Sequence, residues 1–442
     1  MNIKNRFLKL QTSTGIMKYL SNTSWLLAER ILRMGVGLFV GIWIARYLGP
    51  ENFGLFSYAQ SYVLLFTAIA SLGLDGIVVR ELVKNEDYTA KLLGTAFVLK
   101  FIGALLVNLL LYISMYYNIS EKSANVLIFI IGSATIFQSF NVIDFYFQSK
   151  VLSKYVVFSN AICLFISSIT KVVLIVNDGT LTQFALVFIF DGIVLVIGLM
   201  FFYSKKEKTI VKWTFDKKLA ITLLRDSWPL IFSAMVVSIY MKIDQVMIQS
   251  QLGNAAVGQY AAAVRLSEAW YFIPTIIASS LFPSIIKIKQ KCQTTYLKRF
   301  QNLNDLMVWG AISISIPVTF LADFIIIRLY GEQYQEATDV LILHIWASVF
   351  VFMSVASGKF LVVENMNRKV FYRNSCGLVI NICLNIVLIP AYGINGAAVA
   401  TLISWFVAGY LYDLFDKDVN YIFRIKSNSF NPMRLFRLGI SK

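Results

Sequence analysis

Long apolar stretches alternate with short polar turns along the whole chain, and this alternation predicts a bundle of membrane-spanning helices. A helix needs about 20 mostly apolar residues to cross a bilayer. No Gly/Ser linker or low-complexity run interrupts the series. We place about twelve spans in the 442 residues: 24–47, 56–74, 92–116, 126–147, 156–176, 184–203, 223–249, 259–282, 306–329, 339–360, 371–390 and 396–414.

Two similar turns, about 200 residues apart, indicate that the chain consists of two related halves. Residues 48–56 (LGPENFGLF) join the first two spans, and residues 252–260 (LGNAAVGQY) join the seventh and eighth. In each copy, two glycines bracket the turn, Gly49 with Gly54 and Gly253 with Gly258. Glycine tolerates a positive φ and lets two backbones approach closely. The alternative is a common hairpin turn that arose twice.

The repeat predicts an all-α polytopic membrane protein with two pseudo-symmetric six-helix lobes around a central cavity, a plan typical of transporters. We assign residues 1–203 to the N-terminal lobe and 223–414 to the C-terminal lobe. A basic connection, 204–222, joins the lobes, and a basic tail, 415–442, follows them. We expect this tail to lie as an anchor on the surface of the inner leaflet.

The composition agrees with a membrane protein, since 58% of the residues are hydrophobic and 14% are charged. Most of the 40 basic residues fall in the tails and the even-numbered connections, for example Lys205, Lys206, Lys287 and Lys289. Cytoplasmic loops are enriched in Lys and Arg, so we predict that both termini are cytoplasmic. This topology and contact with membrane lipids account for the net charge of +16, and we predict no nucleic-acid partner.

Four basic residues lie far from the ends of predicted spans, where ionisable groups are costly unless they face a polar cavity or a partner. They are Arg30 and Arg33 in the first span, Lys242 in the seventh and Arg265 in the eighth. We predict that they line a cationic lumen and bind a phosphate or pyrophosphate group of the substrate. Local salt bridges and snorkelling side chains are the alternatives.

Three carboxylates within the spans are candidates for ion coupling: Asp244, Glu268 and Asp144. We expect Lys242 to favour the ionised form of Asp244, and Arg265 to pair with Glu268 three residues further along the helix. H⁺ or Na⁺ is the expected coupling ion, and no other cofactor is predicted.

The side chains that catalysis or a metal centre would need are sparse. The four cysteines show no CxxC or CxxH spacing, and the lone histidine, His344, has no second imidazole near it in sequence. No nucleophile or paired-carboxylate motif is present, so we predict a transporter with neither catalytic residues nor a metal site.

Several segments resemble the Wzx-type O-antigen flippases of the polysaccharide exporter superfamily, also called the MOP superfamily. They are 226–230 (DSWPL), 239–245 (IYMKIDQ), 252–260, 264–274 (VRLSEAWYFIP), 44–50 (IARYLGP) and 390–401 (PAYGINGAAVAT). They are distributed from residue 44 to residue 401, so the resemblance extends over nearly the whole chain.

The resemblance implies a flippase that moves undecaprenyl-diphosphate-linked O-antigen or polysaccharide repeat units from the cytoplasmic to the periplasmic leaflet of the bacterial inner membrane. It also implies alternating access and ion-coupled antiport. No motif identifies the residues that bind the ion. A polysaccharide polymerase or chain-length assembly is a candidate partner, and we expect a monomer because two lobes already form a cavity.

Two alternatives remain. A multidrug-type exporter of the same superfamily would need an acidic or neutral lumen for cationic drugs, opposite in sign to the predicted one. A polytopic glycosyltransferase or polymerase acting on lipid-linked sugars would need a sizeable extracytoplasmic loop. The longest such connection predicted here is the short segment 330–338.

Overall fold

A computed structural model of the chain describes residues 14–117, 122–207, 213–289 and 292–434. The described part is helical and contains no strand. Positions 208–212 of the predicted connection and 435–442 of the predicted tail lie outside it. The chain forms two compact units, one made of residues up to 44 with 62–238, and the other of residues 45–61 with 239 onward.

The prediction of about twelve spans is confirmed in the described ranges. Nine helical stretches are long and apolar enough to cross a membrane. Two of them turn back at a glycine with positive φ, at Gly49 (φ 71°) and Gly393 (φ 60°), and so provide two spans each. The eighth predicted span corresponds to two shorter helices in succession, α10 and α11.

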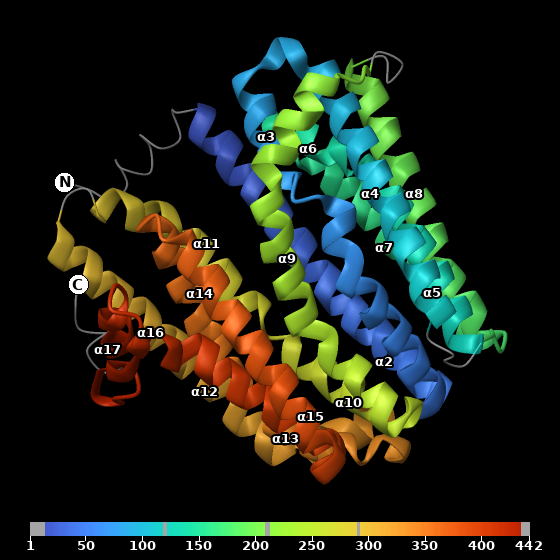
Figure 1. Ribbon diagram of the computed structural model, residues 1–442, viewed down its shortest axis with the longest axis vertical. Coiled ribbons are helices and arrows are strands. Elements are labelled where there is room, and N and C mark those ends of the chain that lie inside the picture. The colour runs from blue at the N-terminus through green and yellow to red at the C-terminus, as the bar shows by residue number, and fades with distance from the viewer. Residues whose placement is uncertain (1–13, 118–121, 208–212, 290–291, 435–442) are drawn as a thin grey trace. The chain divides into compact units, whose positions relative to one another are not determined.

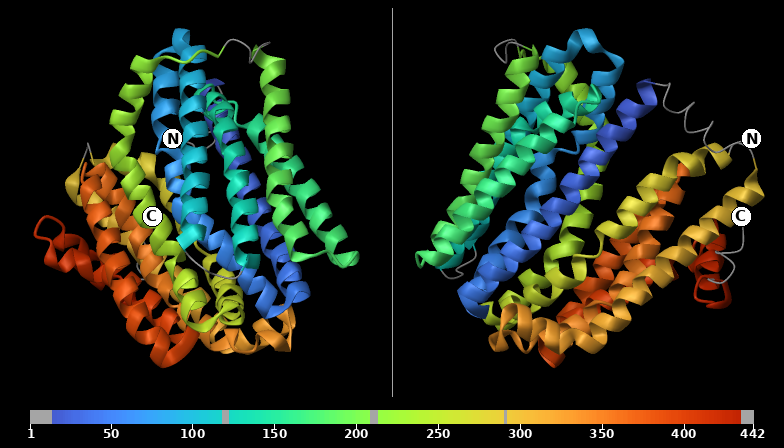
Figure 2. Two further views of the ribbon diagram at one scale, coloured as in Figure 1. Left: turned by 45° about the vertical axis from the view of Figure 1, so that its right-hand side comes forward. Right: turned by 180° about the vertical axis from the view of Figure 1, so that it is seen from behind.

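The first unit contains the N-terminal half of the chain apart from the tip of its first helical hairpin (Figure 1). Its elements are α2 (Thr14–Ser71, in part), α3 (Asp75–Lys84), η1 (Glu86–Tyr88), α4 (Thr89–Tyr117), α5 (Lys122–Ser133), η2 (Ala134–Asn141), α6 (Val142–Ser149), α7 (Lys154–Val176), α8 (Leu181–Glu207) and the start of α9 (Lys217–Leu252). Helices α7 and α8 form an antiparallel hairpin (Figure 2). Buried apolar residues such as Leu93, Val142 and Phe147 make the core between α3, α4, α6 and α8.

The second unit is built on the remainder of α9 and the helices that follow it. These are α10 (Asn254–Glu268), α11 (Phe272–Lys289), α12 (Gln293–Tyr330), η4 (Glu332–Tyr334), α13 (Ala337–His344), α14 (Ala347–Val363), α15 (Asn367–Phe406), the π-helix η5 (Val407–Leu411), α16 (Tyr412–Phe415) and α17 (Asn420–Asn428). Phe300, Met353 and Phe360 are among the fully buried residues where α11, α12 and α14 pack.

The two glycine turns have the conformations that the repeat predicts. Gly49 and Gly253 have φ of 71° and 85°, a region that side chains with a Cβ rarely adopt. The second glycines meet each other within the second unit: a Cβ on Gly54 would collide with the carbonyl oxygen of Asn254, and one on Gly258 with that of Pro50. The two copies of the motif therefore pack backbone against backbone.

The described part of the tail includes a helix that packs on other helices of the second unit. Helix α17 packs on α16 and α12, and its Lys426 is fully buried. The Lys426 ammonium lies 2.7 Å from a carboxylate oxygen of Asp413, which is 2% exposed, and also donates to the carbonyl oxygen of Gly409. Burial lowers the pKa of Lys426 to about 8, while Asp413 opposes this shift. A buried carboxylate at the end of the last span thus pairs with one basic residue of the tail, and the surface anchor stays a prediction.

Cys292 is the residue that precedes α12, and its thiol receives hydrogen bonds at the start of this helix. The Sγ atom lies 3.1 Å from Thr294 Oγ1 and 3.3 Å from Thr295 Oγ1. These hydrogen bonds stabilise the thiolate and lower the pKa of Cys292 to about 7, from an ordinary value of 9.0.

We therefore expect Cys292 to be alkylated rapidly at neutral pH, because a thiolate forms as the pH rises through about 7. The measurement is the rate of iodoacetamide labelling between pH 6 and 9 in a variant whose Cys163, Cys376 and Cys383 are serine. Thr294→Ala with Thr295→Ala should move the midpoint upward by at least about one pH unit. An unchanged midpoint in that double variant would show that the two hydroxyls do not lower the pKa.

Candidate functional site

The most enclosed charged group among the predicted site residues is Asp244, which lies in α9 and is 5% exposed. It accepts three hydrogen bonds from residues of the second unit. Tyr260 Oη of α10 donates over 2.9 Å, Asn385 Nδ2 of α15 over 2.7 Å, and Thr401 Oγ1 of α15 over 2.5 Å. These three hydrogen bonds occupy both oxygens of the buried carboxylate and fix its position.

Oxygen atoms gather around this carboxylate. Asn381 Oδ1 accepts a hydrogen bond of 3.1 Å from Asn385, while the Oδ1 atom of Asn385 is buried and has no hydrogen-bond partner among the described residues. A small cavity borders Asp244, Tyr260, His344 and Thr401, with room for little more than one water molecule or one small ion. The polar side chains that line this cavity include the Asp244 carboxylate and the hydroxyl groups of Tyr260 and Thr401, and such oxygen atoms can bind a small cation.

The predicted partners of Asp244 and Glu268 were wrong. Lys242 does not pair with Asp244, but lies 3.2 Å from a carboxylate oxygen of Glu268. Arg265 makes no ion pair with Glu268 and instead stacks over the ring of Phe53, with its guanidinium carbon 5.8 Å from the ring centre. The helix packing of α9 against α10 brings Lys242 to Glu268 across 26 residues, which the local i,i+3 spacing did not anticipate.

His344 contributes to the same part of the second unit. It is buried in α13, and its Nδ1 atom lies 2.6 Å from Ser267 Oγ. The ring is also edge-on to Tyr260, at 6.2 Å between centres. In the described residues no group of three or more His, Cys, Asp or Glu side chains has the arrangement of a metal site.

The predicted site residues of the first unit, Arg30, Arg33 and Asp144, differ in their exposure and in their partners. Arg30 and Arg33 are both exposed on α2, and Arg33 is paired with Glu29 one turn earlier through its Nε atom, at 2.7 Å. Asp144 is half-buried in α6, near the charges of Asp75 and Lys100.

Lys100 of α4 is a further cation within a predicted span, and it forms a local salt bridge. It is 3% exposed, lies 2.9 Å from Asp75 Oδ1, and its ammonium stands 4.6 Å from the ring centre of Phe145. Two of the four predicted lumen cations, Arg33 and Lys242, also have a carboxylate partner. A lumen shared by all four stays a prediction.

The residues that surround Asp244 were not predicted from the sequence: Tyr260, Asn381, Asn385 and Thr401. One signal was present: Asn381 and Asn385 are four residues apart, so they lie on one face of the eleventh predicted span. Two amides on one face of an apolar helix indicate a buried polar contact.

Comparison with solved structures identifies the fold. The fold is similar to that of the lipid II flippase MurJ in an inward closed conformation, with a TM-score of 0.69 and 17% identity, over 94% of this chain and 92% of that one. It is also similar to an inward-facing multidrug resistance MATE family transporter of the MOP superfamily, with a TM-score of 0.67 and 14% identity, over 89% and 95% of the two chains. The chain has the all-α fold of the MOP superfamily transporters.

The family follows from the sequence. The family described as "Polysaccharide biosynthesis protein" matches residues 19–289, more than half of the chain, and the chain belongs to this family. The probable flippase AglR of Haloferax volcanii is 24% identical over 392 residues, which are 84% of this chain and 77% of that protein. The putative O-antigen transporter of Shigella dysenteriae is 20% identical over 363 residues, 81% and 90% of the two chains. The predicted resemblance to flippases of the MOP superfamily, and to a transporter rather than an enzyme, is thereby confirmed.

Proposed function

We propose that the protein is a flippase that moves undecaprenyl-diphosphate-linked O-antigen or polysaccharide repeat units from the cytoplasmic to the periplasmic leaflet. Membership of the polysaccharide biosynthesis family carries this proposal. Its relatives support the substrate class, since they include a probable low-salt glycan biosynthesis flippase of Haloferax volcanii and the putative O-antigen transporter of Shigella dysenteriae. The proposed location is the bacterial inner membrane, with both termini in the cytoplasm and a monomer as the working unit.

A diphosphate needs such a protein because an isolated ion is costly to transfer into hydrocarbon, by several kcal/mol even after relaxation. Arg30 and Arg265 are the predicted lumen cations that make no ion pair among the described residues. A guanidinium group binds phosphate oxygens through two parallel hydrogen bonds. We therefore propose that Arg30 and Arg265 contact the diphosphate oxygens directly.

We propose Asp244 as the group that couples transport to H⁺ or Na⁺, ahead of Glu268 and Asp144. Glu268 is already paired with Lys242, and Asp144 has a hydrogen bond with Gln148, whereas Asp244 receives hydrogen bonds from Tyr260, Asn385 and Thr401. Hard cations prefer carboxylate, amide and hydroxyl oxygens, which Asp244, Asn381, Asn385 and Thr401 supply. Ion binding there would shift the balance between two transport states if one state holds these oxygens in place and the other separates them.

The first experiment is complementation of a flippase-null strain, scored by surface polysaccharide at matched protein expression. We expect wild type to rescue, and Arg30→Ala and Arg265→Ala to reduce rescue at least about tenfold, because a charge-assisted contact to phosphate is lost. Lys122→Ala is the matched control, since Lys122 lies at the start of α5 and outside the predicted lumen.

The Lys242–Glu268 pair needs its own comparison. Lys242→Ala alone leaves the carboxylate of Glu268 without its partner, so the double variant Lys242→Met with Glu268→Gln is measured beside it. Rescue by the double variant assigns the pair to structure, and loss in both assigns Lys242 to the substrate. Full activity of all arginine and lysine variants would overturn the cationic lumen, whereas failure of wild type would overturn the proposed substrate class.

A further inference from the structure

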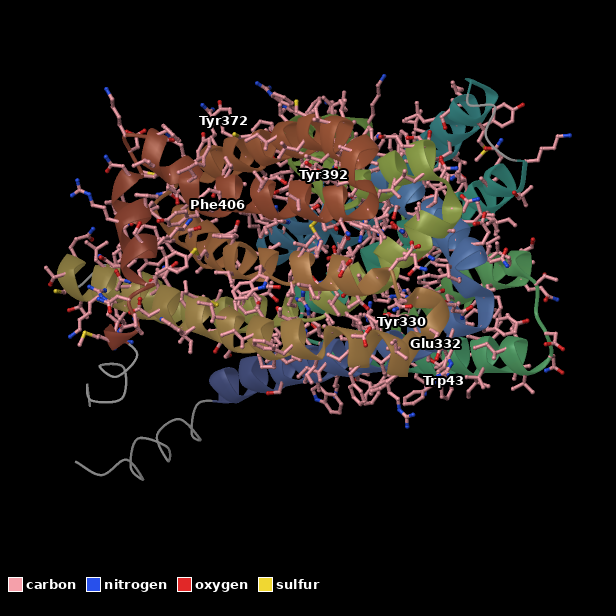
Figure 3. The ribbon with its side chains drawn as sticks, turned by 90° about the horizontal axis from the view of Figure 1, so that it is seen from below. Trp43, Tyr330, Glu332, Tyr372, Tyr392 and Phe406 are labelled. Carbon is pink, nitrogen blue, oxygen red and sulfur yellow. The ribbon has the colours of Figure 1, made fainter. Side chains whose placement is uncertain are left out.

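The π-helix η5 is a single turn that separates the residues around Asp244 from the C-terminal tail. Phe406, which is labelled in Figure 3, is the last residue of α15 before this π-turn. The backbone N–H of Tyr412 donates to the carbonyl oxygen of Val407, five residues earlier, whereas an α-helical N–H bonds to the fourth residue before it. The helix that supplies Thr401 to Asp244 thus has a break about two turns after that residue.

The buried positions of this span show what the π-turn changes. Thr401, Ser404 and Ala408 are buried, and their spacing of three and four residues is that of one face of an α-helix. The next buried side chain is Asp413, five residues further on, while Tyr412 is only half-buried. In an uninterrupted α-helix, Asp413 would lie about 140° around the axis from Ala408. The π-turn therefore lets both Thr401 and Asp413 point into the interior of the second unit.

The tail helix α17 holds the π-turn through two side chains. Lys426 donates to the carbonyl oxygen of Gly409 inside the turn, and its ammonium also pairs with Asp413, two residues beyond the turn. The hydroxyl groups of Tyr410 and Ser427 lie 2.9 Å apart. A side chain that inserts into the hydrogen-bond ladder of a helix is a known cause of a break at that place. Lys426 thus supplies both a donor to the turn and a positive charge to the carboxylate that the turn directs inward.

Loss of the Lys426 donor would act on the other end of the span. Gly409 is buried, and a Cβ atom on it would lie 2.5 Å from the carbonyl oxygen of Phe350, so the π-turn touches the backbone of α14. Closing the turn to regular α-helical pairing would rotate the two ends of the span by about 100° relative to each other. Even part of this rotation, at the end that carries Thr401, would break its 2.5 Å contact with Asp244.

We propose that Lys426 is a positioning residue for the cation site, because by holding the π-turn it fixes Thr401 next to Asp244. This inference rests on the proposed role of Asp244 in binding the coupling ion. It makes the tail helix α17 a part of the ion-coupling machinery. Docking of the tail and binding of the ion then favour each other, since the coupling between two sites is reciprocal.

The first test measures ion affinity in a variant that removes the donor without leaving an unpaired charge. Lys426→Met with Asp413→Leu replaces the buried ion pair by apolar side chains of similar volume, which proteins often tolerate. The half-saturating NaCl concentration is read from the rise in unfolding temperature, with KCl keeping the ionic strength constant. We expect this concentration to increase at least about fivefold, the effect of one lost hydrogen bond. A loss of stability alone would lower the unfolding temperature without NaCl and leave the half-saturating concentration unchanged.

Trp309→Phe is the matched control. Trp309 Nε1 donates to the carbonyl oxygen of Ser429 in the tail, and among the described residues it has no hydrogen bond with Gly409 or Asp413. This variant loosens the tail and should leave the half-saturating NaCl concentration as in wild type. An unchanged concentration in Lys426→Met with Asp413→Leu, or an equal increase in Trp309→Phe, would overturn the assignment to Lys426.

A second measurement needs no substitution in the tail and decides the question if the double variant does not fold. Hydrogen–deuterium exchange of the peptide that contains α17 is compared in NaCl and in KCl. Because the coupling is reciprocal, Na⁺ should slow this exchange about fivefold in wild type and have no effect in Asp244→Asn.

The two measurements separate this inference from the proposed function. Equal exchange of α17 in both salts, in a wild type that Na⁺ stabilises, would overturn the inference and leave the cation site at Asp244 in place. A wild type that Na⁺ does not stabilise would overturn Na⁺ binding at Asp244 and this inference with it. Rescue of the flippase-null strain tests the flippase function independently of both outcomes.

Discussion

Gly54→Ala is expected to prevent the protein from accumulating in a stable folded form. The added methyl group would collide with the carbonyl oxygen of Asn254 and approach the amide nitrogen of Gly258 within 2.7 Å. Both atoms belong to the backbone, which cannot move aside as a flexible side chain can. Extra methylenes in well-packed interiors cost about 1–3 kcal/mol, and we expect at least the upper end of this range here. Thermal unfolding in detergent, followed by size-exclusion chromatography, measures the loss.

Gly310→Ala is the matched control, because Gly310 lies inside α12 and a Cβ there has no heavy atom of another part of the structure within 4 Å. Alanine is the better helix former by about 1 kcal/mol, so this variant should be as stable as wild type or slightly more so. Gly258→Ala should resemble Gly54→Ala, since its methyl group meets Pro50. Normal stability of both turn variants would show that the two turns do not pack against each other as described.

Asp244→Asn is expected to abolish ion-dependent transport while leaving the protein folded. Asparagine has nearly the same shape and keeps an oxygen that can accept from Thr401 or Tyr260, but it lacks the negative charge that holds a cation. An ion that binds only the folded state stabilises it by about 2.7 kcal/mol at 100 times its dissociation constant. Wild type should therefore show an ion-dependent rise in its unfolding temperature, and Asp244→Asn should show none.

Sodium and proton coupling give different results in this measurement. If Na⁺ is the ion, stabilisation follows NaCl and not KCl at constant ionic strength and pH. If H⁺ is the ion, transport in proteoliposomes follows the pH gradient and the NaCl titration is flat. Asp144→Asn serves as the control carboxylate and should retain the wild-type response. A wild-type response in Asp244→Asn would exclude this residue as the coupling site.

The spans could be predicted from the sequence because each is a local property of about 20 residues. The turns at Gly49 and Gly253 were predictable for a similar reason, since a positive φ selects glycine wherever it occurs. Breaks inside a span carry no such signal. The eighth span is interrupted between Glu268 and Phe272, and the tenth between His344 and Ala347, although apolar residues continue through both.

The surroundings of Asp244 could not be predicted because they depend on distant residues. Asn385 and Thr401 are 141 and 157 positions away from it in sequence. A single sequence gives no measure of which helix faces meet across such separations. Lys242 was therefore predicted to interact with Asp244, which is two residues away, but it pairs with Glu268 of α10. The spacing in the sequence predicted interactions within α9 and within α10, whereas the Lys242–Glu268 ion pair joins these two helices.

The boundary between the units has a consequence for how the chain can be divided. Residues 45–61 precede most of the first unit in sequence, yet they pack with the second, where the hydroxyl of Tyr334 donates 2.7 Å to the carbonyl oxygen of Ala45. A cut in the connection at 208–212 would thus leave the second unit without part of its own interior. Each of the two fragments made by that cut should be degraded when it is produced alone. Both should accumulate only when they are co-expressed, because each fragment contains residues that belong to the other unit.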